Sequence, residues 1–463
     1  MNHTNLFNAA TYTQRRQQLK QQLGEGLILL LGNEEASMNY KDNWYPFYQD
    51  STFRYYFGID LSGLTGVINI DTNEEIVFGP EQSIDDVIWT GPLPSLASLA
   101  EQVGIKKVMP TGKIADYLKS AKKLHYLPPY RPEHELKLQT WTGKTILEPS
   151  LDLIQAIVAQ RSVKSEAEVA EIEKAVTYTS RMHRNVMQFA RQGMKEHEVA
   201  AEAVRYAEST NNLLSFPLIC TTQGQVLHNH YRGNTLQAGD MLLFDGGIQT
   251  QAGYAGDMTR TIPVGTSFTE RQRELYQVVL DTHEAAMAAL KPGILYKDVH
   301  LLACRKLTDG LKQVGLMRGD TDEAVQAGAH TMFFQCGLGH MMGMDVHDME
   351  NLGEQYVGYT PELRKSTEFG LKSLRLGRAL EPGFVLTVEP GIYIIPELID
   401  MRRNDKVAQQ FINFDKLDSY RDFGGIRTED DLLITENGSR ILGEPLPKTI
   451  AEVEAMRQQA LQL

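Results

Sequence analysis

The sequence predicts an α+β protein with two domains: an N-terminal α/β domain over residues 1–160, and a larger domain over residues 161–463 in which helices pack on a curved, mainly antiparallel sheet. Three observations lead to this prediction. A chain of 463 residues is too long for one ordinary hydrophobic core. Strand-like and helix-like segments alternate through the first part of the chain. Beyond it, long helical patterns are mixed with short strand-like segments that begin or end at acidic residues.

The strands of the first domain are expected where short apolar runs lie between turn residues. An apolar run fits a buried strand, and a pair of segments around the turn at 71–73 fits a hairpin. Pro128, Pro129 and Pro132 interrupt the pattern before the last helix of this domain. The strand segments are residues 26–32, 65–70, 75–78 and 103–109.

The second domain is expected to begin near residues 158–164, where new helix-start signals follow. A capping box satisfies free backbone groups at a helix start, and two are present: Ser165 with Glu168, and Thr269 with Gln272. The first helix carries apolar residues at helical spacing up to Phe189, and the second stops before Pro292. A C-terminal helix and four strands complete the domain, over residues 450–463 and over 241–244, 258–264, 384–388 and 432–435.

Charge and composition exclude several classes of partner. The formal charge is −13, whereas a nucleic-acid-binding surface needs a basic footprint. No apolar stretch reaches the length of about 18 residues that a membrane-spanning helix needs. The N-terminus lacks a secretory pattern, and Cys220, Cys304 and Cys336 are widely spaced without a Cys-x-x-Cys pair. We therefore expect a cytoplasmic protein with no nucleic-acid or membrane partner.

Five residues able to bind metals lie in five short, glycine-marked phrases. Taken singly, an acidic residue beside glycine is more often a turn residue, and a histidine among glycines fits a turn as well. Taken together, four carboxylates and one imidazole suffice for two adjacent divalent cations, which can ionise a water. The phrases are LLFDGG with Asp245, GYAGDMTRT with Asp257, CGLGHMMG with His340, LTVEPGIY with Glu389 and FGGIRTEDD with Glu429.

These five phrases resemble those of the pita-bread metallopeptidases, in the proline-specific branch that contains prolidase (Xaa-Pro dipeptidase) and aminopeptidase P. The resemblance covers nearly the whole chain, and YPFYQDSTFRYYFGID (45–60) is similar to that branch's N-terminal creatinase-type domain. It implies that Asp245 binds one metal, that His340 and Glu389 serve the other, and that Asp257 and Glu429 bridge both. Such a donor set suits manganese, with cobalt, zinc or iron as alternatives.

The resemblance also implies roles for residues around the metals. His228 and His347 match two active-site histidines that contact the substrate and stabilise the tetrahedral intermediate, and His230 could share that role. Glu389 is expected to carry a proton to the leaving nitrogen as well. Arg427 is expected to orient ligand carboxylates beside the substrate site.

Arg375 aligns with an arginine that holds the C-terminal carboxylate of a dipeptide in prolidases, a task that suits a guanidinium fork. A surface ion pair is the alternative role for this side chain. The segment 351–380, which precedes Glu389, lengthens the spacing from His340 as in prolidases. It is expected to add a lid or a wall to the cleft.

Two substrate-site positions depart from the family pattern. Cys336 stands where the family has a histidine, and Phe216 stands where relatives carry a tyrosine. A thiol is a weak hydrogen-bond donor, and losing one positioned donor costs about 10²–10³ in turnover. Cys336 as a metal-bound thiolate is an alternative.

The sequence thus predicts a metallo-exopeptidase that hydrolyses the Xaa-Pro bond of short peptides as a dipeptidase. The alternatives are an Xaa-Pro aminopeptidase acting on longer peptides, a peptidase of other specificity, and a low-activity or non-catalytic metal-binding homologue because of Cys336. Amidinohydrolases and carbon–sulfur lyases share the fold, so fold alone does not decide the reaction. A homodimer is expected from the resemblance alone.

Overall fold

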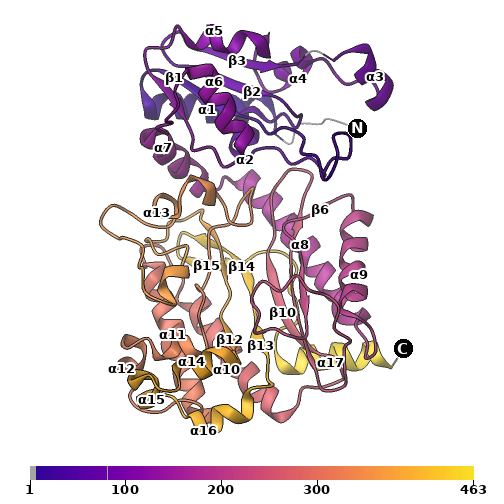
Figure 1. The fold of residues 1–463 in the computed structure, drawn as a ribbon, viewed down its shortest axis with the longest axis vertical. Coiled ribbons are helices and arrows are strands. Elements are labelled where there is room, and N and C mark those ends of the chain that lie inside the picture. The colour runs from indigo at the N-terminus through magenta and orange to yellow at the C-terminus, as the bar shows by residue number, and fades with distance from the viewer. Residues whose placement is uncertain (1–6, 81, 463) are drawn as a thin grey trace. The chain divides into compact units, whose positions relative to one another are not determined.

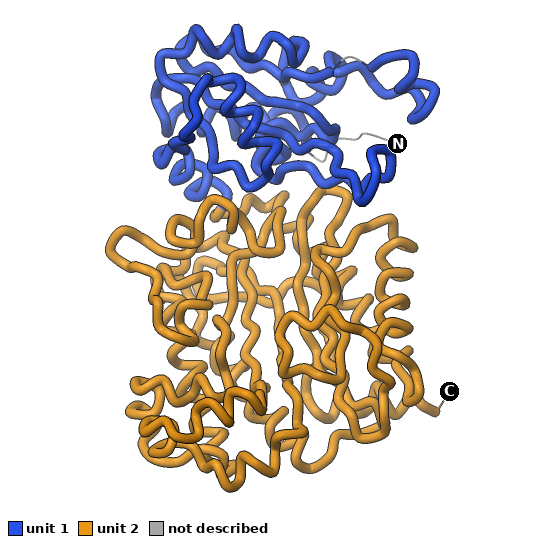
Figure 2. Tube along the Cα trace, in the orientation of Figure 1, with its two compact units in different colours: residues 1–161 blue, residues 162–463 orange. Residues whose placement is uncertain are grey.

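The computed structural model describes residues 7–80 and 82–462. The chain divides into two compact units, residues 1–161 and 162–463 (Figure 2). Among the described residues, every helix is too short or too polar to span a bilayer.

The first unit is built on a mixed sheet with the strand order β4-β3-β2-β1-β5; Figure 1 labels its three middle strands, β1, β2 and β3. β1 pairs antiparallel with β2 and parallel with β5, while β3 pairs antiparallel with β2 and parallel with β4. The predicted buried strand and hairpin are confirmed. The strands are β1 (Leu27–Leu31), β2 (Thr65–Asn69), β3 (Glu74–Gly79), β4 (Lys107–Pro110) and β5 (Leu124–Tyr126).

The strand expected over residues 103–109 is only partly correct. Gly104 has a φ of 78°, in the left-handed region that suits glycine, and it turns the chain just after a helix. The extended segment therefore starts only at Lys107. The apolar residues Val103 and Ile105, which suggested a strand, are buried within this turn.

Helices flank the sheet of the first unit. Side chains from alternate positions of the strands, such as Leu27, Leu29 and Val67, form a buried cluster together with Ile114 and Leu138. The helices are α1 (Ala9–Leu23), α2 (Ser51–Phe57), α3 (Ile84–Thr90), α4 (Leu96–Gln102), α5 (Ile114–Leu118), α6 (Pro132–Thr142) and α7 (Leu151–Ser162), with the 3₁₀ turn η1 (Thr111–Lys113).

Two of the long helices of the second unit begin at the capping residues that the sequence indicates. Ser165 and Thr269 each make the predicted capping box, and Thr449 makes a capping box with Glu452 that was not predicted from the sequence. The expected C-terminal helix ends at Leu461, and Leu463 lies outside the described residues. The long helices are α8 (Glu166–Phe189), α9 (Glu196–Ser209), α10 (Glu270–Ala289), α11 (Tyr296–Val314) and α17 (Ile450–Leu461). The short ones are α12 (Thr321–Gln326), α13 (Glu354–Val357), α14 (Pro396–Arg402), α15 (Lys406–Phe411) and α16 (Phe414–Leu417), with the 3₁₀ turns η2 (Ala329–Met332), η3 (Glu350–Leu352), η4 (Leu371–Ser373) and η5 (Asp418–Tyr420).

The strands of the second unit pair antiparallel in several small sheets, with the orders β10-β8-β7, β11-β14-β15, β12-β13 and β6-β9. Helices α8, α9 and α17 pack against β7, β8 and β10, and α10 packs against β11, β12 and β13 (Figure 1). The strands are β6 (Leu213–Leu214), β7 (Ile219–Thr221), β8 (Met241–Gly246), β9 (Ile248–Gln249), β10 (Met258–Pro263), β11 (Val385–Val388), β12 (Gly391–Tyr393), β13 (Gly425–Arg427), β14 (Asp430–Thr435) and β15 (Gly438–Ile441).

Candidate active site

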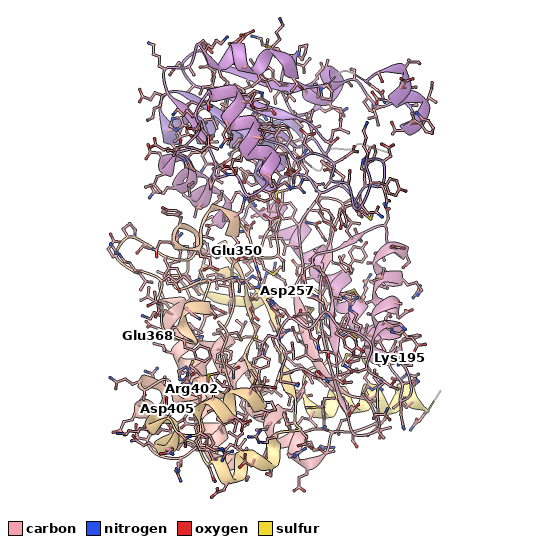
Figure 3. The ribbon with its side chains drawn as sticks, viewed as in Figure 1. Lys195, Asp257, Glu350, Glu368, Arg402 and Asp405 are labelled. Atoms are coloured by element: carbon pink, nitrogen blue, oxygen red, sulfur yellow. The ribbon has the colours of Figure 1, made fainter. Side chains whose placement is uncertain are left out.

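The strands of the second unit bring the predicted metal ligands together by their register. Asp245 in β8 lies opposite Thr259 in β10, and Thr259 forms a bridge with Glu429 on its other side. Asp257 lies two residues before Thr259, so its side chain falls on the same face. Glu389 directly follows β11, whose last residue pairs with the residue after Glu429. Four acidic residues that are distant in sequence therefore meet in the middle of the unit, where Figure 3 labels Asp257.

The ligand atoms of Asp257, His340 and Glu429 all lie within 4.8 Å of one another, and all three residues are buried. The Nε2 atom of His340 lies 3.4 Å from Asp257 Oδ2 and 3.7 Å from Glu389 Oε1. Oδ1 of Asp245 and Oδ1 of Asp257 are buried without a hydrogen-bond partner. Orphaned buried oxygens in such a cluster are the arrangement expected around bound cations.

The orientation of His340 supports the same conclusion. Its Nδ1 lies 3.1 Å from the carbonyl oxygen of Met341, and because a carbonyl only accepts, Nδ1 must carry the hydrogen. The other nitrogen, Nε2, then points a lone pair at the carboxylates of Asp257 and Glu389. The Nε2 lone pair and the carboxylate oxygens repel one another unless a cation lies between them. This set of donor atoms therefore fits divalent metal ions.

The carboxyl groups of the cluster repel one another when no cation is bound. Burial and the charge of Asp245 raise the pKa of Asp257 well above its usual value, and burial and the charge of Asp257 do the same for Glu429. Burial raises the pKa of Glu389 to about 7. The folded metal-free protein therefore binds more protons than the unfolded chain, and its stability falls as the pH rises from 4.5, the ordinary glutamate value, through about 7.

We expect metal removal to destabilise the protein more at higher pH. Treatment with EDTA should lower the melting temperature at pH 6 and lower it further at pH 8. Each kcal/mol by which repulsion between the carboxylates lowers the free energy of unfolding should reduce the melting temperature by an additional ~2–4 °C. Thermal scans of chelated and metal-replete protein at both pH values measure the effect. An equal drop at the two pH values would contradict the placement of several ionising carboxyls in one cluster.

A cavity of about 280 Å³ opens on the cluster. All the residues that the sequence suggested as metal ligands, catalytic residues or substrate contacts line this cavity. Leu227, Val346 and Ser373 also line it, and nothing in the sequence marked them. The predicted lining residues are Phe216, His228, His230, Asp245, Asp257, Cys336, His340, His347, Arg375, Glu389, Arg427 and Glu429.

Arg427 connects a ligand carboxylate to the cavity wall. It donates from Nη2 to Asp245 Oδ2 at 2.5 Å, from Nη1 to the Tyr393 hydroxyl at 3.0 Å and from Nε to Thr259 Oγ1 at 3.1 Å. Thr259 in turn donates to Glu429 Oε2 at 2.7 Å. Arg427 and Thr259 thus fix two of the acidic side chains. Tyr393 was missed in the sequence, although it stands four residues after Glu389 in the same phrase.

Cys336 lies on the wall beside Tyr393, with its sulfur 3.9 Å from the tyrosine oxygen. Burial raises the pKa of the Cys336 thiol to about 12, so the group is a neutral thiol near pH 7. Among the described residues, the group of mutually close ligand atoms is formed by Asp257, His340 and Glu429 without this sulfur. The geometry therefore gives the metal-thiolate alternative no support.

His347 is held from two sides. Its Nδ1 donates to Glu350 Oε2 at 2.6 Å, and its ring packs edge-on against His340 with the ring centroids 4.3 Å apart. The neighbouring Asp348 forms a fully buried ion pair with Lys164, with Nζ 2.9 Å from Oδ2. Burial lowers the pKa of His347, so its ring is neutral near pH 7 and presents Nε2 as an acceptor.

The Lys164–Asp348 pair predicts a large stability effect. Both side chains are only 1% exposed, and removing one partner of a buried pair typically costs about 3–5 kcal/mol. We therefore expect Lys164→Met to lower the free energy of unfolding by that amount in urea titrations. The exposed pair of Lys119 and Asp116 provides the control, since Lys119→Met should leave the transition unchanged. Equal midpoints for the wild type and Lys164→Met would contradict the prediction.

Comparison with known proteins agrees with this geometry. The model of metallopeptidase family M24 matches residues 170–436, and that of the aminopeptidase P N-terminal domain matches residues 12–126. The chain belongs to metallopeptidase family M24. The resemblance stated from the sequence is confirmed, as is the expected fold with an N-terminal aminopeptidase P-type domain and a pita-bread domain. Membership in this family implies divalent metal ions in the cluster.

Several members of the M24 family are similar over nearly the whole chain. The human Xaa-Pro dipeptidase is 34% identical, with 93% of this chain and 88% of that protein covered. A probable Xaa-Pro aminopeptidase of Sordaria macrospora is 33% identical, with 94% and 92% covered. The solved structure of Escherichia coli aminopeptidase P with the inhibitor Pro-Leu is 27% identical, has a TM-score of 0.80, and is matched over 99% of this chain and 100% of that chain.

Proposed function

We propose that this M24 metallopeptidase hydrolyses the bond between a first residue and proline in short peptides, as an Xaa-Pro dipeptidase. The observation that carries the proposal is the buried group of Asp257, His340 and Glu429, whose ligand atoms lie within 4.8 Å of one another at the end of a substrate-sized cavity. The similarity to Xaa-Pro dipeptidases over 93% of the chain supports the substrate class.

We assign the metal ligands as the sequence suggested. Asp245 would hold one cation, His340 and Glu389 the other, and Asp257 and Glu429 would hold both. Two bound divalent cations supply Lewis acidity and lower the pKa of a bound water. The chain's own contribution is to keep these side chains in place, and Arg427 does so through its hydrogen bonds to Asp245 and Thr259.

We assign separate roles to the two histidines on the cavity wall, His228 and His347. His228 faces the cavity and can donate a hydrogen bond to the developing oxyanion. Neutral His347 carries its hydrogen on Nδ1, which donates a hydrogen bond to Glu350, so Nε2 can only accept. His347 thus donates to the oxyanion only after taking up a proton. Glu389 has a second oxygen free to move a proton to the proline nitrogen that leaves.

Arg375 is the residue that we assign to the substrate's C-terminal carboxylate. It lines the cavity, and a third of its side chain is exposed there, so its guanidinium can reach a ligand. A dipeptide presents a carboxylate one residue after the scissile bond, whereas a longer peptide presents a neutral amide there. The apolar side chains of Phe216, Ile219 and Leu227 provide surface for the proline ring.

The decisive experiment is an assay of metal-replete protein on Ala-Pro and Ala-Pro-Ala. A dipeptidase cleaves Ala-Pro faster, an aminopeptidase cleaves Ala-Pro-Ala faster, and a non-catalytic homologue cleaves neither, which would overturn the proposal. We expect Arg375→Ala to lower kcat/KM for Ala-Pro by roughly tenfold to a hundredfold and to change Ala-Pro-Ala much less. Equal losses on the two peptides would remove Arg375 from carboxylate binding.

Three finer assignments accompany this function. Manganese is the proposed metal, because carboxylate-rich sites with one imidazole suit it, and metal analysis of the purified protein tests it. A homodimer is proposed by similarity to relatives, and light scattering tests it. A cytoplasmic location is supported by Cys220, Cys304 and Cys336, which are all free thiols, and cell fractionation tests it.

A further inference from the structure

A compact group of charges surrounds Arg375, the member that lines the cavity; the others are Glu350, Glu354 and Lys365. Arg375 Nε lies 3.5 Å from Glu350 Oε2 and 3.6 Å from Glu354 Oε1. Lys365 forms an ion pair with Glu354. We call these four residues the Arg375 cluster. It contains two acids and two bases, so the positive charge of Arg375 is already balanced before any substrate enters.

The backbone around Arg375 is fixed by the segment that precedes it. Gly377 and Arg378 both donate their N–H groups to the Gly358 carbonyl at 2.8 Å, and the Tyr359 hydroxyl donates to the Leu374 carbonyl at 2.7 Å. A Cβ atom on Gly358 would come within 1.8 Å of the Arg375 carbonyl oxygen, so only glycine fits there. Arg375 is thus held at a set place relative to the two glutamates.

Glu350 is fixed in the same way (Figure 3). Met349, just before it, has a φ of 62°, a left-handed conformation that is uncommon for a side-chain-bearing residue. The turn lets Oε2 of Glu350 reach back to accept the hydrogen bond from His347 at 2.6 Å. That hydrogen bond lowers the pKa of Glu350 to about 2, so the carboxylate is charged across the neutral range. A negative charge therefore lies beside Arg375 near neutral pH.

The guanidinium of Arg375 still offers a hydrogen-bond donor to a ligand. Its Nε faces the two glutamates and is buried, whereas the side chain as a whole is 33% exposed and lines the cavity. The exposed Nη groups are therefore the donors that a substrate carboxylate can reach without displacing Glu350. The bound carboxylate is then repelled by the charges of Glu350 and Glu354 on the other side of the guanidinium. A neutral amide at the same place is not repelled.

We propose that Glu350 is a specificity-determining residue, which weakens binding of substrates with a free C-terminal carboxylate by opposing their charge at Arg375. The proposal rests on the proposed function and deepens it. Glu350 sets how strongly the enzyme prefers dipeptides over peptides that continue past proline. Because it also holds His347, any change in the position of that histidine affects both substrate types alike and cancels in their ratio.

The test compares Ala-Pro with Ala-Pro-amide, which lacks only the carboxylate charge. Glu350→Gln keeps an oxygen acceptor for His347 and removes the charge. We expect the ratio of kcat/KM for Ala-Pro over Ala-Pro-amide to rise about tenfold, mainly through a lower KM for Ala-Pro. Glu354→Gln should shift the ratio in the same direction but less, because Glu354 also pairs with Lys365. A ratio unchanged in Glu350→Gln overturns the proposal.

Glu368→Gln is the matched control, since Glu368 is an exposed residue of the same segment that lies outside the Arg375 cluster (Figure 3). It should leave the ratio unchanged. A ratio that rises equally in Glu368→Gln would assign the effect to net charge and overturn the role of Glu350.

Binding to metal-free protein separates this proposal from the proposed function. Calorimetric titration of Ala-Pro and Ala-Pro-amide needs no turnover. If the metal-replete enzyme cleaves neither peptide, the proposed function fails. The ratio of the two Kd values in wild type and Glu350→Gln still decides the role of Glu350. A tenfold change in favour of Ala-Pro supports it, and no change, or no binding of Ala-Pro, overturns it.

Discussion

Replacing Glu429 with glutamine is expected to reduce turnover of an Xaa-Pro substrate by at least roughly 10³-fold, and to lower the bound metal in the same protein. Glutamine has the same shape but no charge, and the bridging role proposed for Glu429 would need a carboxylate to screen the repulsion between two cations. Loss of a cation removes several kcal/mol of transition-state stabilisation, which corresponds to this factor. Steady-state kinetics and metal analysis of the dialysed variant measure the two effects.

The control for this variant is Glu436→Gln, at an exposed position in the turn after β14. It makes the same chemical change a few residues away and should keep both activity and metal content. Because Glu429 is buried and accepts a hydrogen bond from Thr259 at 2.7 Å, its glutamine variant can keep that contact and remain folded. A folded Glu429→Gln protein with normal metal and normal turnover would show that this carboxylate is not a ligand.

Replacing Cys336 with histidine is expected to raise turnover by roughly 10²-fold. The Cys336 thiol lies on the cavity wall as a neutral group, and a thiol is a weak donor. An imidazole at this position would add a strong donor to the cavity wall, and one donor that reaches the reacting carbonyl is worth about 10²–10³ in turnover. The change should appear mainly in kcat, measured with Ala-Pro at saturating metal.

Cys336→Ala separates the gain of a donor from the loss of sulfur. It removes the thiol without adding a donor, so its turnover should stay near that of the wild type. If the histidine and alanine variants are equally active, position 336 does not reach the reacting atoms. In that case the cysteine in the CGLGH phrase has no catalytic consequence.

The residues that the sequence singled out lie around one cavity, and they could be found because each stands in a short phrase whose chemistry is local. The strand ends beside Asp245, Asp257 and Glu429 could be placed from hydrophobic alternation, and the helices from Ser165 and Thr269 as capping residues. The joint pattern of five phrases then identified the family. Strand boundaries were less certain, as the helix-ending turn at Gly104 shows.

The features that were missed depend on contacts between distant segments. Tyr393 is linked to the acidic cluster by the hydrogen bond that Arg427, from another strand, donates to its hydroxyl. Glu350 and Arg375 are 25 residues apart and meet because the turn at Met349 and the close packing at Gly358 bring them together. No periodicity or motif predicts this contact, because it depends on the backbone path of the intervening segment and not on a recognisable pattern of side chains.

The buried contact between Lys164 and Asp348 also limits where an expressed fragment of the second unit can begin. Lys164 stands just before the first long helix of unit 162–463, at a position that a boundary drawn at the Ser165 helix cap would discard. A gene fragment beginning at residue 165 would lack Lys164 and leave the Asp348 carboxylate in the interior without that cation, next to His347 on the cavity wall. Dissection of the peptidase portion should therefore start upstream of residue 164.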